Sequence, residues 1–284
     1  MTSRFVPSIP SDLSAIPELV ELLDDKTAAV LTGAGCSTAS GIPDYRGPET
    51  KDDDHNPIMY NDFVTDPAAR RRYWARSAIG WPRIRRAEPN DAHRHLAELE
   101  RRGRLTGIVT QNVDDLHEAA GCRAVLALHG SLSDVVCLAC RTVIDRGDIQ
   151  RRIERENPGW TDQHGGRLAP DGDMELPEEI PPNFRVPHCT DCGGILKPDV
   201  VFFGENVAAS IVDRAWEIVD DADALLVVGS SLTVYSGFRF VRGADRRGLP
   251  VAIVNLGSTR GDDHATLRVE ARVGDALGAL CRRL

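Results

Sequence analysis

The sequence predicts an α/β protein: a Rossmann-like domain with a parallel sheet, and a small domain made of a zinc ribbon and a helical module. Three observations lead to this prediction. Short apolar segments alternate with stretches of helical periodicity, as in a parallel sheet covered by helices. Four of the apolar segments end directly in small or polar residues, where open α/β sheets bind ligands. Two Cys-x-x-Cys pairs lie in the middle of the chain.

Length and composition narrow the class of protein. The 284 residues carry a net charge of −9 and 42% are hydrophobic, which fits one large domain with a smaller appendage. This acidic balance argues against a basic nucleic-acid-binding face. No run of about 18 apolar residues occurs, so we expect no membrane span, and no signal peptide is evident. Paired cysteines suit a reducing compartment, so we expect a cytoplasmic protein; the oligomeric state is left open, and a monomer is compatible.

The first strand leads into a glycine-rich turn. Residues 11–25 have helical periodicity, and 28–31 (AAVL) form a short buried strand. The segment 32–41 (TGAGCSTASG) then predicts a turn and a helix that ends by Pro43, with backbone N–H groups facing a pyrophosphate. Arg46 falls on the next loop, where it can meet a phosphate. The spacing is not GxGxxG, so a dehydrogenase fingerprint fits poorly, and a glycine turn without a ligand is the alternative.

Helices are predicted between the first and second strands. Residues 48–60 form an acidic, mobile loop, and 61–81 and 89–102 form helices, with Asn90 or Asp91 as the cap of the second. The second helix carries two histidines at i and i+2, which we interpret as packing residues rather than ligands: His93 and His95.

Candidate catalytic groups follow the next two strands. The segment 105–109 is an apolar strand that leads directly into 110–117 (TQNVDDLH), whose amide and carboxylate groups can face a ligand. The strand at 124–128 leads into His129, a base that can titrate near neutral pH. The alternative is that Asp114 or Asp115 only caps a helix.

The two cysteine pairs predict one tetrahedral Zn²⁺ site with four thiolates: Cys137, Cys140, Cys189 and Cys192. Four ligands leave no open position, so the zinc is expected to be structural. His188 is a competing ligand, but it is not needed. Residues 157–187, rich in Pro, Gly and acids, are expected to form a long loop that could cover a cleft.

The C-terminal part supplies two more strands of the same kind. The segment 224–228 ends in Gly229-Ser230-Ser231, and 251–254 ends in Asn255-Leu256-Gly257. Four such ends predict one extended ligand across the carboxyl edge of the sheet. The other expected elements are a helix at 208–220, a short strand after residue 264 and a helix at 275–283.

These motifs together resemble the sirtuins, the NAD-dependent protein deacylases. The matching segments run in family order over nearly the whole chain: 33–47, 110–117, 128–130, the two Cys-x-x-Cys pairs, 197–205, 229–236 and 255–257. Further segments resemble class II sirtuins, the group that includes sirtuin-4: 80–82, 89–93, 168–173 and 234–240. The resemblance implies NAD and one structural Zn²⁺ as cofactors and an acyl-lysine protein or peptide as partner, with no nucleic-acid or membrane partner.

The resemblance also implies residue roles. His129 would be the general base, and Asn112 would contact the nicotinamide ribose. Asp114 would accept the nicotinamide carboxamide, and Arg46 would help to hold the nicotinamide end of NAD. The expected NAD-contact residues are Gly33, Ala34, Gly35, Thr38, Asp44, Tyr45, Arg46, Gln111, Asn112, Val113, Asp114, Gly229, Ser230, Ser231, Asn255, Leu256, Gly257 and Val273.

Two segments would flank the acyl-lysine peptide as an added strand. Their expected contact residues are Val201, Phe202, Phe203, Gly204, Leu232 and Tyr235. Tyr73 and Arg76 resemble a Y-x-x-R pair that grips carboxylate-ended acyl groups in a related sirtuin class. We therefore hypothesise that dicarboxyl-type acyl chains are accepted. The alternative is a surface arginine beside a packed tyrosine.

The predicted organisation has three parts: a discontinuous Rossmann-like domain (1–47, 91–133 and 198–284), a helical module (48–90) and a zinc-binding module (134–197). The predicted activity is NAD-dependent lysine deacylation, on acetyl or longer or dicarboxyl chains, releasing nicotinamide and O-acyl-ADP-ribose. Protein mono-ADP-ribosylation is the first alternative, because it needs the same residues. A zinc-ribbon module that binds nucleic acid and an NAD dehydrogenase are more distant ones.

Overall fold

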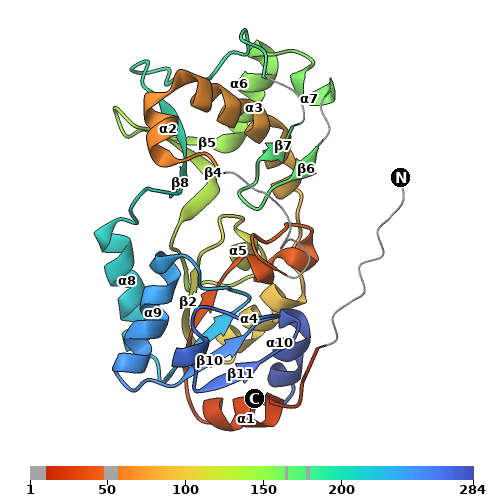
Figure 1. Cartoon of the computed structure of the whole chain (residues 1–284), viewed down its shortest axis with the longest axis vertical. Coiled ribbons are helices and arrows are strands. Elements are labelled where there is room, and N and C mark those ends of the chain that lie inside the picture. Colours follow the sequence, from red (N-terminus) through yellow and green to blue (C-terminus); the bar gives the residue numbers. More distant parts are fainter. Residues whose placement is uncertain (1–10, 48–56, 164–165, 177–179) are drawn as a thin grey trace.

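A computed structural model describes residues 11–47, 57–163, 166–176 and 180–284 of the chain. The molecule is elongated, with a parallel sheet and its helices in one half and a smaller module in the other (Figure 1). Most of the expected acidic loop, residues 48–56, lies outside the described residues. No helix in the described ranges has the length and apolar character needed to cross a membrane.

The large half contains a six-stranded parallel sheet, which confirms the predicted fold class. The strand order is β11-β10-β9-β1-β2-β3. The strands are β1 (Ala28–Thr32), β2 (Leu105–Thr110), β3 (Val125–Ala127), β9 (Ala224–Val228), β10 (Val251–Val254) and β11 (Leu267–Val269). In the register, Thr32 of β1 lies beside Thr110 of β2 and Val228 of β9, so these strands end at one level. The segments that follow them are therefore neighbours in space.

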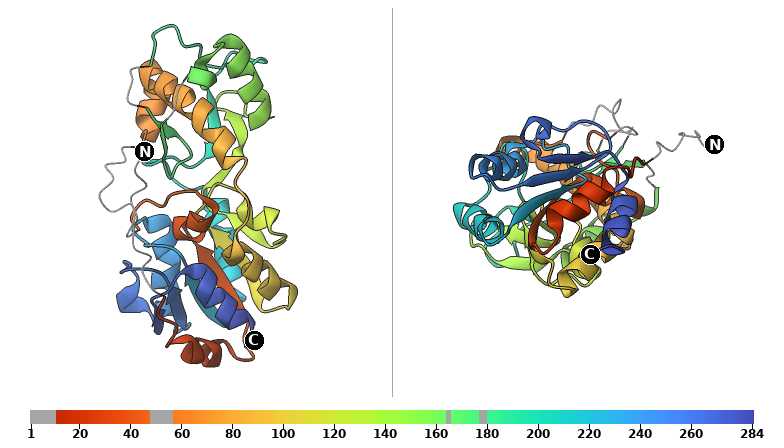
Figure 2. Two further views of the ribbon diagram at one scale, coloured as in Figure 1. Left: turned by 90° about the vertical axis from the view of Figure 1, so that its right-hand side faces the viewer. Right: turned by 90° about the horizontal axis from the view of Figure 1, so that it is seen from below.

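Helices cover both faces of this sheet, and strand β1 is accordingly buried along its whole length (Figure 2). Successive side chains of a strand point to opposite faces. Val30 thus packs in a core with Leu96, and Leu31 packs in another with Phe240. The first layer has α1 (Ile16–Leu23), α4 (Asp91–Arg101) and α10 (Val273–Cys281), and the second has α8 (Ala209–Asp220) and α9 (Tyr235–Arg246).

The small half has its own core, shared by the helical and zinc-binding segments. Phe63 and Trp74 pack there with Ile149 and Leu196. Its helices are α2 (Tyr60–Thr65), α3 (Pro67–Ile84) and α6 (Arg146–Glu156), and its antiparallel sheet has β4 (Gly130–Cys137), β5 (Val143–Asp145) and β8 (Leu196–Val200) in the order β5-β4-β8. The two segments therefore stabilise each other.

Some helices and strands of the structure were not predicted from the sequence. Helix α6 was not predicted, because its many charged residues hide the buried face that Ile149 and Ile153 form. Helix α9 was not predicted either, although Phe238, Val241 and Ala244 form a buried stripe. The expected long loop is not irregular throughout: it contains α7 (Trp160–Gln163), β6 (Arg167–Leu168) and β7 (Met174–Glu175).

The helix predicted between the glycine-rich turn and Pro43 is wrong. Two short 3-10 turns stand there, η1 (Ala34–Cys36) and η2 (Thr38–Ser40). The physical reason is tertiary: the Asn90 side chain donates to the Cys36 carbonyl at 2.9 Å, an acceptor that an α-helix would use internally. Gly41, at φ 84°, then ends the second turn. The remaining short elements are α5 (Leu116–Ala119) and η3 (Asp262–His264).

Candidate active site

A cavity of about 2440 Å³ is lined both by the carboxyl edge of the parallel sheet and by residues of the small half. All the predicted NAD-contact residues line it, from Gly33 in the first turn to Val273 at the start of α10. Of the predicted substrate residues, Tyr73, Val201, Phe202, Phe203, Gly204, Leu232 and Tyr235 also line it. Arg76 is not among the lining residues. The segment Arg167–Asp173 contributes to the wall, as expected of a loop over a cleft.

The turns after β1 and β9 are in direct contact. The backbone N–H of Gly35 donates to the Gly229 carbonyl at 2.9 Å. A Cβ at Gly35 would lie 2.9 Å from that same oxygen, so only glycine fits without a shift. The side chain of Gln111, after β2, donates to Ser230 Oγ at 2.9 Å. Three strand ends thus form one connected surface that exposes backbone to the cavity.

Asn112 and Asp114 are joined through Ser37, a residue of the glycine-rich motif with no predicted role of its own. Asn112 Nδ2 lies 3.0 Å from Ser37 Oγ, and that hydroxyl donates to Asp114 Oδ2 at 2.6 Å. Asp114 Oδ1 also accepts from the Leu116 backbone at 3.0 Å, so the capping alternative holds beside the functional one. Burial raises the pKa of the Asp114 carboxyl. The only sequence signal for Ser37 was its place inside the glycine-rich motif.

His129 is held in the cavity wall with both ring nitrogens in contact. Nδ1 lies 2.9 Å from the Gln111 carbonyl oxygen and Nε2 lies 2.8 Å from Ser236 Oγ. Burial lowers the pKa of the imidazole, the Gln111 contact raises it, and the charge of Arg239 lowers it further. The net shift keeps the ring neutral at physiological pH, which is the form that can accept a proton.

His93 and His117 lie behind the glycine-rich turn, where burial keeps both neutral. Burial lowers the pKa of His93 to about 4 and that of His117 to about 3. His93 Nδ1 accepts from the Asn90 backbone at the start of α4, as expected of a packing histidine. Together with Cys36 they form a fully buried group of possible metal donors, but both rings already have hydrogen-bonding neighbours.

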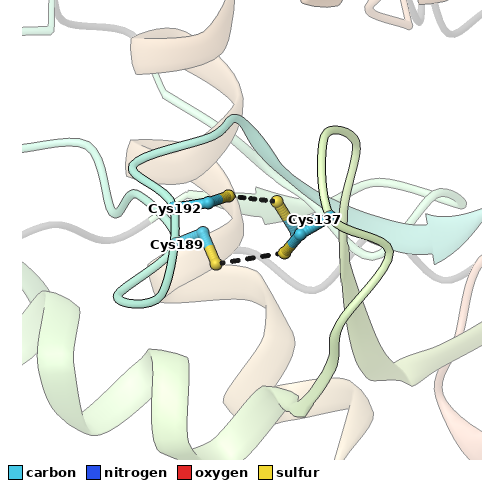
Figure 3. A group of neighbouring side chains, drawn as sticks. Cys137, Cys189 and Cys192 are labelled. Atoms are coloured by element: carbon cyan, nitrogen blue, oxygen red, sulfur yellow. Dashed lines mark hydrogen bonds between the residues drawn. The ribbon is translucent and has the colours of Figure 1, made fainter.

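The four predicted zinc ligands converge, and Figure 3 shows three of them, Cys137, Cys189 and Cys192, pointing toward one another. Their sulfur atoms all lie within 4.8 Å of one another, and two pairs are 3.5 and 3.7 Å apart: Cys137 with Cys192, and Cys140 with Cys189. A tetrahedral site with Zn–S bonds of about 2.3 Å needs sulfurs about 3.8 Å apart. A Cβ at Gly194 would lie 2.9 Å from Cys137 Sγ, so the second knuckle requires this glycine. The cluster fits one zinc ion, and His188 is not part of it.

Tyr73 and Arg76 differ in their surroundings. The Tyr73 ring packs edge-on against Phe63 and Trp74, and its hydroxyl is buried beside Ser77. Arg76 Nε donates to the Met174 carbonyl at 2.9 Å. The neighbouring Asp173 is buried in the cavity wall, and burial raises the pKa of its carboxyl, although the Arg76 charge opposes the shift.

Comparison with known proteins identifies the family. Residues 33–236 match the Sir2 family, and the chain belongs to it. It is 53% identical to an NAD-dependent protein deacetylase of Xanthomonas campestris over 251 residues, covering 88% of this chain and 85% of the relative. It is 50% identical to NAD-dependent protein deacetylase 1 of Streptomyces coelicolor (97% and 92% covered), and 47% identical to the mitochondrial NAD-dependent protein lipoamidase sirtuin-4 of Bos taurus (97% and 89% covered).

Solved structures agree with this assignment. A Sir2 structure with a p53 peptide and NAD⁺ superimposes with a TM-score of 0.75 at 30% identity, covering 94% of this chain and 97% of the other. A Sir2 structure bound to an acetylated peptide gives a TM-score of 0.74 at 29% identity, with the same coverage. The predicted resemblance to the sirtuins, including sirtuin-4, is confirmed.

Proposed function

We propose that this protein is an NAD-dependent protein lysine deacylase that releases nicotinamide, a free lysine and O-acyl-ADP-ribose. The observation that carries the proposal is the shared cavity: the ends of β1, β2, β9 and β10 line it together with a neutral His129 and the two expected peptide-flanking segments. The names of the relatives support the same activity.

Each group of residues in the cavity is positioned to act on a different part of NAD. The contacting glycine turns, which line the cavity, would hold the pyrophosphate of NAD along the edge of the sheet. Bound NAD supplies the ADP-ribosyl group to which the acyl chain is transferred as nicotinamide leaves. Asn112 and Asp114, joined by Ser37, offer an amide and a carboxylate to the nicotinamide half. With NAD bound, His129 Nε2 would accept the proton of a ribose hydroxyl, and the exposed Arg46 would contact the nicotinamide end.

A panel of acyl-lysine peptides with NAD tests the proposal, with nicotinamide release and O-acyl-ADP-ribose as readouts. The parent should form both products in equal amounts, and His129→Ala should lose the acyl ester by a factor of about 10² or more. Label from NAD that stays covalently on a protein acceptor, with no acyl ester formed, would favour mono-ADP-ribosylation instead.

For acyl specificity, we propose that Tyr73 and Arg76 act on carboxylate-ended chains. Tyr73 lines the cavity, which supports this role, whereas Arg76 does not line it and Asp173 places a carboxyl group near the same arginine. Arg76→Met should lower kcat/KM for glutaryl-type peptides by about 10-fold, a charge-assisted contact of about 1.4 kcal/mol, and spare acetyl and lipoyl peptides. Asp173→Asn, the matched control, should raise glutaryl activity. Equal loss on all three substrates in Arg76→Met would reject the carboxylate role.

We also propose a cytoplasmic, reducing location. The support is chemical: four converging thiols bind zinc only when they are kept reduced. Cell fractionation tests it, because recovery in an oxidising compartment with the two cysteine pairs as disulfides would contradict this location.

A further inference from the structure

Ser236 contacts the proposed base in a way that the sequence did not suggest. His129 Nδ1 lies 2.9 Å from the Gln111 carbonyl oxygen, and a carbonyl can only accept a hydrogen bond. Nδ1 therefore carries the ring proton, and Nε2 keeps its lone pair. Ser236 Oγ lies 2.8 Å from Nε2, so its hydroxyl donates to that lone pair. The imidazole is held from both sides.

The two contacts come from different parts of the fold that meet at one junction. Gln111 follows β2, and Ser236 is the second residue of α9, 107 positions from His129. Gly237 permits the approach, because a Cβ there would lie 2.4 Å from Gln111 Oε1. Ser236 is 9% exposed, so its hydroxyl faces the junction rather than bulk solvent.

We propose that Ser236 is a positioning residue that holds His129 for the acyl-transfer step, an inference that rests on the proposed function. A serine hydroxyl donates to a neutral Nε2 and accepts from the Nε2–H of an imidazolium, so it can hold the ring before and after proton transfer. In between, the hydroxyl turns aside and the ribose hydroxyl gives its proton to Nε2. The contact sets the orientation of the ring rather than its charge.

The variant Ser236→Ala removes the contact at Nε2 and leaves the contact at Nδ1. The kcat for acyl removal should fall on the order of 10- to 100-fold, because small misplacements of a catalytic group cost this much. The KM values for NAD and peptide should stay within about twofold, since binding is unaffected. Exchange of labelled nicotinamide into NAD should persist in the presence of acyl peptide, because nicotinamide leaves before His129 acts. Ser236→Thr keeps a hydroxyl and should restore most of the rate.

Two comparisons separate positioning from a loss of structure. In a His129→Ala background, adding Ser236→Ala should cost nothing further, because a residue that acts through His129 has no effect without it. Ser210→Ala is the matched control: Ser210 is also the second residue of a helix, α8, but it is exposed. Its kcat should equal that of the parent.

An unchanged kcat in Ser236→Ala would overturn the proposal. So would a parallel loss of exchange and acyl removal, or a further loss in the His129→Ala background. A parent protein that shows neither exchange nor acyl removal would overturn the proposed function itself, and this role with it.

Discussion

At the scale of single residues, two side chains of α9 influence His129. Ser236 touches the imidazole, and Arg239, three positions on, adds a positive charge that lowers its pKa. Arg239 and Arg242 both lie 5.3 Å from the Tyr235 ring centroid, but only Arg239 affects His129. Arg239 and Arg242 therefore differ in one respect that can be tested: only Arg239 lowers the pKa of His129.

We predict that Arg239→Gln moves the acid limb of the pH profile of kcat/KM to higher pH. The positive charge disfavours the imidazolium, so its removal raises the pKa of His129, and a larger fraction of the ring is protonated on the acid side. Activity should fall more at pH 6 than at pH 8. Arg242→Gln should keep the parent profile. A downward shift in Arg239→Gln, or equal shifts in both variants, would contradict the assignment.

At the scale of elements, the site depends on how closely the ends of neighbouring strands approach. The turns after β1 and β9 touch through Gly35 and Gly229, and Gly229 has a φ of 60° that favours glycine. The parallel register brings these turns to one level, and the absence of a side chain at Gly35 lets them meet.

Gly35→Ala should weaken NAD binding at least about 10-fold, a loss of about 1.4 kcal/mol, because the added methyl pushes the two turns apart. Ser210→Ala is the control, since Ser210 is exposed on α8 and does not line the cavity. Calorimetric titration with NAD would measure both. Parent-like affinity in Gly35→Ala would show that the contact is not needed. The zinc content of both variants should be unchanged.

At the scale of the whole molecule, two halves with their own hydrophobic cores enclose one cavity, and a small cluster that includes Ile84 and Leu116 joins them. The small half has its own core around Phe63 and Trp74, and the zinc-binding cysteines join that core through Cys137 and Cys189. The parallel sheet packs in two other clusters. Zinc should therefore stabilise one half of the molecule far more than the other.

We predict that removing zinc splits unfolding into two steps. The exposed Cys140 and Cys192 give a chelator access, and structural zinc contributes several kcal/mol to the folding of the unit that holds it. Cys192→Ser should bind less than one zinc per chain, and its small half should melt first, with loss of peptide binding. Cys122→Ser, in the other half, should keep one zinc. One cooperative transition at an unchanged temperature after chelation would refute this independence.

Much of the site could be predicted because its polar and small residues directly follow the strands. An apolar run followed at once by TGAG, TQN, GSS or NLG marks both a strand and its carboxyl end, and all parallel strands end at the same edge. The zinc ligands were equally visible, because their spacing is fixed by the metal. Helices α6 and α9 were missed, since charged residues interrupt their apolar pattern.

The sequence by itself determined the parallel sheet, the four strand-end loops, the zinc ligands and the family, because each follows from local periodicity, local spacing or motifs in order. Only the tertiary structure decided which groups touch. It replaced the expected helix after Gly35 with two short turns, because Asn90 takes the Cys36 carbonyl. It also joined Asn112 to Asp114 through Ser37 and brought Ser236 to His129 across 107 positions. Contacts between distant segments depend on how the elements pack, and no local pattern records that packing.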